Sequence, residues 1–581
     1  DLMKTVLRFL KPYKTKILLV ILCMAAEAAG GLLIPTVTAD IINTGIAGGD
    51  LGCILRRGGL MLVIAAAAAA AALGASYTAA AFSANFGRDL RCAVYDKTLT
   101  FSADDAEHFG TGTLITRTLS DVSIVQQTTV MLLQGILPVP LVCAAGIFLA
   151  FRIDRTAGFL LLGLTALILA ASVLVMRRTT PLFEKQQRLL DRMNLSVRES
   201  ITGVRVVRAF NKEAAEAKRL GGIFDGYRGV SIRANRMFAG LDCTLMLIIN
   251  LVTVAILWLG GNRTGAGLME IGDISALSQY AAMILFYLLM AQFTLIMIPR
   301  AVVCAGRLAE ILNRTPTITD PAAPSTAQTG GDEVLRFRHV NFRFSDADTD
   351  ALSDVDFVCR RGETVAIVGS TGSGKSTVAK LALRFHDVTG GEVDFCGTDV
   401  RSLAQGDLRR RIAYVPQQAW LFAGTVKSNL RDGAPGADAA AMHHALTVAQ
   451  ADFITDDADG LARRVSQGGT NFSGGQRQRL AIARALMKHA DLYIFDDSFS
   501  ALDFRTDATL RHALAAETKD AAVLIVAQRI STVLAADRIV VLEDGCVTGI
   551  GRHAELLETC AVYRDIVASQ MKGGVTHGCR I

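Results

Sequence analysis

Two adjacent carboxylates, Asp496 and Asp497, follow the apolar run of residues 492–495 in the stretch LYIFDDSFSALD. Carboxylates at the end of a buried strand can hold a divalent cation or act as a general base on a water molecule. A partner for them lies upstream, where GSTGSGKST follows the apolar run TVAIV and precedes a helical pattern. This order of strand, glycine-rich loop and helix is typical of a loop that binds nucleotide phosphates.

The glycine-rich loop predicts a site for ATP and Mg²⁺. Its glycines let backbone N–H groups wrap the phosphates, Lys375 would reach the β- and γ-phosphates, and the Ser376 hydroxyl would ligate Mg²⁺. Asp496, at the end of a neighbouring strand, would hold the same ion. The loop residues expected to contact ATP are Gly369, Ser370, Thr371, Gly372, Ser373, Gly374, Lys375, Ser376 and Thr377.

A third pattern, NFSGGQRQRLAIARALMKHA, lies shortly before the strand that carries Asp496. Ser473, Gly474 and Gly475 open a helix whose first turn would present N–H groups and a hydroxyl to an anion. Taken alone, this pattern fits any helix start, and its meaning depends on the phosphate-binding loop upstream.

These stretches lie in the second part of the chain, which is predicted to be an α/β domain. Residues 313–332 are rich in Pro, Thr, Ser and Gly, which is typical of a linker. Beyond them, over residues 333–570, short apolar runs alternate with helical patterns, as in α/β domains. Residues 571–581 are expected to form a disordered tail.

The first part of the chain, residues 1–312, is predicted to span a membrane. Of the 581 residues, 51% are hydrophobic and 20% are charged, and the mean hydropathy is +0.37. Apolar runs of about 20 residues or more are long enough to cross a bilayer as helices. The six runs lie at about 17–42, 59–82, 129–151, 157–176, 238–260 and 274–298.

Positive charge predicts the orientation of these spans. Lys and Arg gather before the first run and between the fourth and fifth runs, so both segments would face the cytoplasm. Six spans would return the nucleotide-binding domain to that side. We therefore expect a multi-pass protein of the plasma membrane, the inner membrane in bacteria. The net charge of +6 is small, and Lys and Arg beside the spans explain its sign without a nucleic-acid partner.

Two inner segments, residues 83–128 and 177–237, are predicted to carry the spanning helices on into the cytoplasm. Each is expected to turn at a short crosspiece, GTGTLITRTLSD (residues 110–121) and FNKEAAEAKRL (residues 210–220). Charges inside spans are costly and usually line an interior. Glu27, Asp40 and Asp242 are therefore candidates for a substrate path. For Asp40 and Asp242 the alternative is a position near the membrane surface.

Together these stretches resemble the ATP-binding cassette (ABC) transporters. GSTGSGKST matches the Walker A motif, FSGGQ the signature motif, LYIFDD the Walker B motif, SALD (residues 500–503) the D-loop, and VPQQ the Q-loop at Gln417. Six spans before one nucleotide domain resemble an exporter-type half-transporter. The fold expected from the resemblance is an α-helical transmembrane domain of six spans with an α/β P-loop nucleotide-binding domain of ABC type. The resemblance covers nearly the whole chain.

The resemblance implies roles for further residues. Two nucleotide domains would meet head to tail, so that each ATP touches Walker A and B of one chain and the signature of the other. Phe344 stands where the family has an adenine-stacking aromatic residue, and its ring keeps the π face. Gln417 would approach Mg²⁺, and the crosspieces would dock on the nucleotide domains as coupling helices. The residues implied to bind the partner's ATP are Ser473, Gly474, Gly475 and Gln476.

Two positions depart from the family pattern. The family places Glu, the general base, after the Walker B Asp, whereas Asp497 here is one methylene, roughly 1.5 Å, shorter. The family's switch strand carries His, whereas VLIVAQRIS carries Gln528, whose amide cannot hold a positive charge or shuttle a proton. General-base help is worth about 10²–10⁴-fold, and a misplacement of about 1 Å forfeits much of it. We therefore expect ATP to bind and to be hydrolysed slowly.

The weakened site and the intact signature together predict a heterodimer. The partner half-transporter would carry Glu and His at these positions and would hydrolyse ATP against this chain's signature. The expected function is ATP-driven export of amphipathic small molecules such as drugs, lipids or peptides. Two alternatives stay open: import of metal–siderophore complexes by an exporter-like fold, and a regulatory or channel-like subunit, where degenerate sites also occur.

Overall fold

A computed structural model of the chain describes residues 5, 6, 8–328 and 330–572, and the last nine residues of the predicted tail lie outside this range. The chain forms two compact units. The first comprises Asp1–Thr100 and Phe109–Thr315, and the second comprises Phe101–His108 and Pro316–Ile581. The short segment Phe101–His108 therefore belongs to the second unit, although the residues on both sides of it belong to the first.

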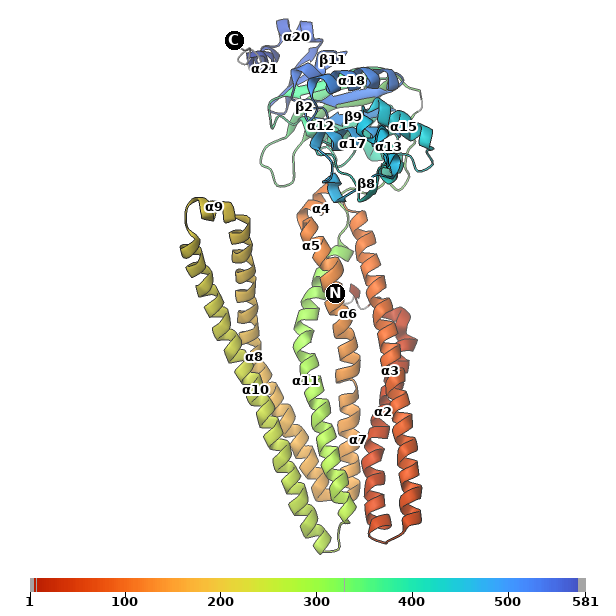
Figure 1. The fold of residues 1–581 in the computed structure, drawn as a ribbon, viewed down its shortest axis with the longest axis vertical. Helices are drawn as coiled ribbons and strands as arrows, with labels where there is room; N and C mark the ends of the chain where they lie inside the picture. The colour runs from red at the N-terminus through yellow and green to blue at the C-terminus, as the bar shows by residue number, and fades with distance from the viewer. Residues whose placement is uncertain (1–4, 7, 329, 573–581) are drawn as a thin grey trace. The chain divides into compact units, whose positions relative to one another are not determined.

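The first unit is built from long helices (Figure 1). Among them α2 packs on α3, and α8 packs along α10. The helices, with 3₁₀ (η1) and π-helical (η2, η3 and η4) segments, are η1 (Lys11–Tyr13), α2 (Lys14–Asp40), η2 (Ile41–Ile46), α3 (Leu51–Leu99), α5 (Thr111–Thr116), η3 (Arg117–Asp121), α6 (Val122–Met131), η4 (Leu132–Ile136), α7 (Pro138–Ile153), α8 (Arg155–Thr202), α9 (Val204–Ala209), α10 (Glu213–Gly265) and α11 (Ile271–Asn313).

Six helices among the described residues are long and apolar enough to cross a bilayer. Each of the six predicted spans overlaps one of them, and four lie wholly within it, so the expectation of six spans is confirmed. Many of their large apolar side chains are exposed, including Leu62, Phe159 and Trp258, which suits contact with lipid tails. Inside the bundle, the buried Tyr280 hydroxyl lies 2.7 Å from the Thr36 hydroxyl, so a polar group among the spans has a partner.

The two crosspieces lie earlier in the chain than the sequence suggested. The first is α4 (Ala103–Phe109), whereas residues 110–121 begin the next long helix as α5 and η3. The second is α9, and most of residues 210–220 belong to α10. Helical periodicity runs through both regions and hides the breaks. The local signals were a capping box between Ser102 and Asp105 and Gly110 with φ +72°, which ends α4.

The charges proposed to line a substrate path have different surroundings. Asp40 ends α2, and its Oδ2 lies 3.2 Å from Nη1 of Arg57, with both side chains partly exposed. This pairing favours the position near a membrane surface. Glu27 is half-buried on α2, and the side chain of Asp242 lies outside the described residues.

The second unit is built around a six-stranded sheet in the order β12-β11-β3-β10-β9-β6. From β11 to β6 neighbouring strands are parallel, and β12 is antiparallel. A four-stranded antiparallel sheet, β2-β1-β4-β5, and a small pair, β7-β8, complete it. The strands are β1 (Glu333–Phe342), β2 (Leu352–Arg360), β3 (Thr364–Gly369), β4 (Gly390–Phe395), β5 (Thr398–Asp399), β6 (Ile412–Val415), β7 (Gly424–Thr425), β8 (Arg464–Val465), β9 (Leu492–Asp496), β10 (Ala522–Val526), β11 (Arg538–Glu543) and β12 (Cys546–Gly551).

Helices cover both faces of the larger sheet, and its central strands are accordingly apolar on both sides. Along β9, Tyr493 and Phe495 join one hydrophobic cluster, while Leu492 and Ile494 join the other. The helices of this unit are α4 (Ala103–Phe109), α12 (Lys375–Ala382), η5 (Val400–Ser402), α13 (Gln405–Arg410), α14 (Val426–Arg431), α15 (Ala439–Val448), α16 (Asp452–Thr455), η6 (Gly460–Ala462), η7 (Gln467–Gly469), α17 (Gly474–Leu486), α18 (Phe504–Glu517), α19 (Ile530–Val533), α20 (His553–Thr559) and α21 (Ala561–Lys572).

Candidate nucleotide-binding site

The glycine-rich loop connects β3 to α12, as the sequence predicted. Gly374 adopts φ +90°, and a Cβ at this position would lie 2.6 Å from the carbonyl oxygen of Ala351. Only glycine fits this combination of a left-handed backbone and a close neighbour. The loop thus turns tightly into the N-terminus of α12, where backbone N–H groups can meet a phosphate.

Lys375 is buried, with 6% of its surface exposed. Its Nζ donates to the carbonyl oxygens of Gly369 at 3.0 Å and Ser370 at 2.5 Å, and it lies 3.4 Å from Oγ of Ser373. Burial lowers the pKa of Lys375, although the nearby carboxylates of Asp497 and Asp496 act in the opposite direction. The ammonium group is therefore already folded against the loop that would hold the phosphates.

Asp496 ends β9 beside the first turn of α12. Its Oδ1 accepts a hydrogen bond of 2.8 Å from the Ser376 hydroxyl, and its Oδ2 lies 3.4 Å from the Tyr414 hydroxyl. Burial raises the pKa of Asp496, and the hydroxyl of Ser376 counteracts this by stabilising the carboxylate. A buried carboxylate and a hydroxyl in contact are hard oxygen donors, and this donor set fits Mg²⁺.

Asp497 takes a different direction from Asp496, because its backbone turns at the strand end. It has φ +47°, a left-handed conformation that aspartate tolerates better than most residues. Its backbone N–H donates to the carbonyl oxygen of Val526 at 2.8 Å, and its Oδ2 accepts from Nε2 of Gln417 at 3.4 Å. Burial raises the pKa of Asp497, against the hydrogen bonds from Gln417 and Ser500.

Gln528 follows β10 and has an exposed side chain. Its backbone is held by a residue that the sequence did not indicate. Nε2 of Gln570, on α21, donates to the carbonyl oxygen of Gln528 at 2.7 Å, and Oε1 of Gln570 accepts from the N–H of Ile530 at 2.8 Å. One amide therefore bridges two backbone groups of the switch segment, and no local pattern could have revealed it.

Phe344 lies just beyond β1 and is half-buried. Its ring meets Phe342 edge to face, with centroids 4.8 Å apart, and His386 likewise at 5.4 Å. Nζ of Lys380, on α12, lies 5.9 Å from the centroid of the Phe344 ring. Helix α12 therefore carries both Lys375, next to the phosphate loop, and Lys380, next to the Phe344 ring.

The predicted signature residues stand at the N-terminus of α17. Oγ of Ser473 accepts from the N–H of Gln476, and Oε1 of Gln476 accepts from the N–H of Ser473 at 2.9 Å, which is a capping box. Ser473 and Gly474 are exposed, whereas Gly475 lies against the carbonyl oxygen of Ala501. The structure therefore brings Lys375, Ser376, Asp496 and Asp497 with Gln417 together, and leaves this helix start open to solvent.

Comparisons with known proteins agree on both units. A family model described as the ABC transporter transmembrane region matches residues 17–289, and a model described as ABC transporter matches residues 352–500. An uncharacterized ABC transporter ATP-binding protein of Mycobacterium tuberculosis is 38% identical over 577 residues, covering 98% of both chains. An ATP-dependent lipid A-core flippase of Ralstonia nicotianae is 30% identical, covering 96% of this chain and 94% of the flippase.

Among solved structures, a bacterial Atm1-family ABC exporter with ATP bound is similar across both units. Its TM-score is 0.79 at 25% identity, and the similarity covers 96% of this chain and 98% of the exporter chain.

Proposed function

The chain belongs to the ABC transporters, as an exporter-type half-transporter with six spans and one ATP-binding domain, and from this premise we propose that it is the slowly hydrolysing subunit of a heterodimeric exporter. A half-transporter works with a second half, so the identity of that half decides how many ATP sites hydrolyse efficiently.

The observation that carries the proposal is the pair Asp497 and Gln528 at the positions of the general base and the switch. Asp497 presents a carboxylate one methylene shorter than the Glu of the family, roughly 1.5 Å, and its backbone is left-handed with φ +47°. The Gln528 side chain can donate a hydrogen bond to a γ-phosphate and cannot carry charge. Misplacement of a base by about 1 Å costs a large part of its contribution, so hydrolysis at this site is slow.

ATP binding is retained in this proposal. Lys375 is poised on the phosphate loop, and Ser376 and Asp496, in contact at 2.8 Å, would hold Mg²⁺, with Gln417 completing the set. Bound Mg²⁺ supplies neutralisation of phosphate charge. The protein's own residues wrap the phosphates, stack on the base at Phe344 and exclude water from the buried Lys375.

The intact signature favours a heterodimer over a homodimer. A homodimer would contain two weakened sites. A partner with Glu and His would instead hydrolyse its own ATP against Ser473, Gly474, Gly475 and Gln476 of this chain, whose helix start is exposed. ATP binding would close the two nucleotide domains, the crosspieces α4 and α9 would transmit closure to the spans, and hydrolysis at the partner's site would reset the pump.

The transported molecules are proposed to be amphipathic, such as drugs, lipids or peptides. The apolar spans support this, and one similar protein is a lipid A-core flippase. We place the transporter in the plasma membrane with its N-terminus and nucleotide-binding domain in the cytoplasm, because Lys and Arg concentrate in the segments next to those parts.

The test is ATP turnover of this chain in nanodiscs, alone and co-purified with a half-transporter that carries Glu and His. Turnover of the chain alone should be about tenfold or more below that of the pair. Equal turnover would contradict the degenerate site. Adding amphipathic compounds to the pair should stimulate its ATPase, and vectorial transport in proteoliposomes separates a pump from a channel-like subunit.

A further inference from the structure

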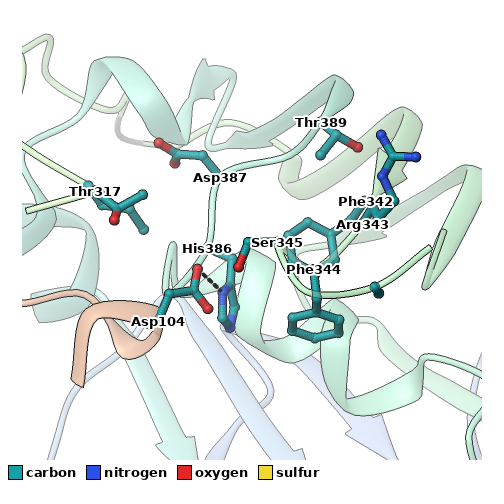
Figure 2. Close-up of a pocket in the computed structure, with 11 residues that line it drawn as sticks. Asp104, Thr317, Phe342, Arg343, Phe344, Ser345, His386, Asp387 and Thr389 are labelled. Carbon is teal, nitrogen blue, oxygen red and sulfur yellow. Dashed lines mark hydrogen bonds and ion pairs between the residues drawn. The ribbon is translucent and has the colours of Figure 1, made fainter. Parts of the chain in front are cut away.

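A cavity opens beside Phe344 within the second unit (Figure 2). Its wall is formed by four segments of the chain: α4, residues 317–318, the residues at and after the end of β1, and the residues after α12. The cavity therefore joins the residue proposed to stack on adenine to one of the crosspieces.

His386 stands between these two parts. Its ring is buried, with 4% exposed, and Nδ1 lies 3.1 Å from Oδ2 of Asp104 on α4. On its other side the ring contacts Phe344 and Phe342, each with centroids 5.4 Å away. Figure 2 shows Asp104 approaching the imidazole from one side and Phe344 from the other. Nε2 is buried and has no hydrogen-bond partner among the described residues.

Among the described residues, the contact with Asp104 is therefore the only hydrogen bond of this buried imidazole. Because a carboxylate can only accept, Nδ1 is the donor. If α4 moved away, Nδ1 would lose this hydrogen bond, and Nε2 has none among the described residues, so the imidazole would be left without a protein partner. The His386 ring is thus tied to the position of α4, and its faces and edges are filled by two phenylalanine rings.

A second contact fastens α4 to the same unit. Asp105 is fully buried, and its carboxylate accepts from the N–H of Thr317 at 2.9 Å and from the Thr317 hydroxyl at 3.0 Å. The adjacent residues Asp104 and Asp105 thus hold α4 on the nucleotide-binding unit. Only three residues separate α4 from the end of the spanning helix α3 at Leu99.

We propose that His386 is a positioning residue that links the nucleotide base to the crosspiece, through the contacts Phe344–His386–Asp104. The inference rests on the proposed role of Phe344. A base stacked on Phe344 restricts the orientation of that ring. This ring in turn restricts His386, and His386 fixes Asp104 at the start of α4. The base, as distinct from the phosphates, then strengthens the attachment of α4.

The test compares two ligands that both carry phosphates. Backbone hydrogen exchange is measured on the full-length chain in nanodiscs without ligand, with Mg²⁺ and ATP, and with Mg²⁺ and inorganic tripolyphosphate. Tripolyphosphate can occupy the glycine-rich loop but has no base to stack on Phe344. We expect both ligands to protect residues 369–377. Only ATP, and not tripolyphosphate, should slow backbone hydrogen exchange in residues 103–109, by about fivefold or more.

Matched variants isolate the contact. His386→Phe keeps an aromatic ring between Phe342 and Phe344 but cannot donate to Asp104, and Asp104→Ala removes the acceptor. Each should abolish the effect of ATP on α4 while the loop is still protected, and the double variant should lose no more than either single one. Asp104→Asn keeps an acceptor oxygen and should retain most of the effect. Glu107→Gln, an exposed carboxylate on the same helix, is the control that should change nothing.

The proposal is overturned if tripolyphosphate protects α4 as well as ATP does, because the base would then play no part. It is also overturned if His386→Phe retains the full effect of ATP, or if the losses in His386→Phe and Asp104→Ala add in the double variant. A different result marks failure of the proposed function itself: if ATP does not protect residues 369–377, the chain does not bind ATP there, and the link through Phe344 falls with it.

Discussion

At the residue scale, the two carboxylates that close β9 meet different partners. Asp496 points to Ser376 on the helix that follows the phosphate loop, while Asp497, turned by its left-handed backbone, meets Gln417. Burial raises the pKa of both. Because one group contacts a hydroxyl suited to Mg²⁺ and the other an exposed amide, their tasks separate: Asp496 is proposed to hold Mg²⁺, and Asp497 to face the attacking water.

The first prediction is that Asp497→Glu raises ATP turnover of the chain. The added methylene moves the carboxylate roughly 1.5 Å further out, which restores part of the general-base contribution. Steady-state hydrolysis in nanodiscs should rise by about tenfold, and further when Gln528→His is added. Introducing Asp496→Asn into Asp497→Glu should remove the gain, because Mg²⁺ is then lost. If neither Asp497→Glu nor the double variant Asp497→Glu/Gln528→His changed turnover, the interpretation of a degenerate base would be contradicted.

At the element scale, β9 is fixed at its start by a third acidic residue. Asp491 precedes the strand, and its carboxylate accepts from Nη2 of Arg361 at 2.9 Å and from Nε of Arg411 at 2.7 Å. Burial alone would raise the pKa of Asp491, but the two guanidinium groups lower it overall. The folded protein therefore favours the ionised carboxylate, and the strand that ends on Asp496 is anchored by charge.

We predict that Asp491→Asn destabilises the second unit by about 2 kcal/mol at pH 7, which lowers its thermal midpoint by about 4–8 °C. Since the pKa is depressed in the folded state, this stability is present above the unfolded pKa of about 3.9 and is lost as the pH falls through the folded value. The difference from wild type should therefore begin to shrink as the pH falls below about 4, and should vanish only below the folded pKa of Asp491. Asp520→Asn, an exposed carboxylate nearby, should leave the midpoint unchanged. A difference that persists in acid would contradict the charge-based anchoring.

Gln570 on α21 makes two hydrogen bonds to the backbone of Gln528 and Ile530, so we predict that α21 holds this segment in place. Gln570→Ala should release the carbonyl of Gln528 and the N–H of Ile530. Backbone exchange in residues 528–531 should speed up by about fivefold or more, as expected when two hydrogen bonds are lost and one of them protects an N–H. Gln570→Glu keeps the acceptor for Ile530 and should give a smaller change. Ser569→Ala, whose hydroxyl bonds within its own helix to Ile566, is the matched control. Equal exchange in Gln570→Ala and wild type would show that α21 does not hold the switch.

The elements with a strong local pattern can be predicted from sequence, whereas those with a weak local signal or defined by long-range contacts cannot. The strand–glycine loop–helix unit at Lys375 and the six apolar runs follow from spacing and length, and the structure places both accordingly. The crosspieces were misplaced because helical periodicity conceals a break set by Ser102 and Gly110. His386 and Gln570 had no signal, since their partners lie 282 and 42 residues away.

At the scale of the whole molecule, the N-terminus of α17 is exposed in the single chain and is free to contact a second chain. Ser473 and Gly474 face solvent, while the chain's own phosphate loop is built from β3 and α12. A helix start with free N–H groups suits an anion from a second chain. The asymmetry proposed for the pair then follows: this chain lends its signature to the efficient site and keeps the inefficient one.

The last prediction tests whether the signature of this chain acts on the ATP bound by the partner. Ser473→Ala in this chain should lower ATP turnover of the pair by about tenfold or more, because in the proposed pair its hydroxyl would donate to the partner's γ-phosphate. ATP binding at the chain's own loop should be unchanged. The substitution also removes a helix cap, so Thr425→Ala, which removes the equivalent cap of α14, is the matched control and should leave turnover near wild type. If Ser473→Ala and Thr425→Ala lowered turnover equally, the loss would come from helix stability. If Ser473→Ala had no effect, the signature of this chain would not serve the partner's ATP.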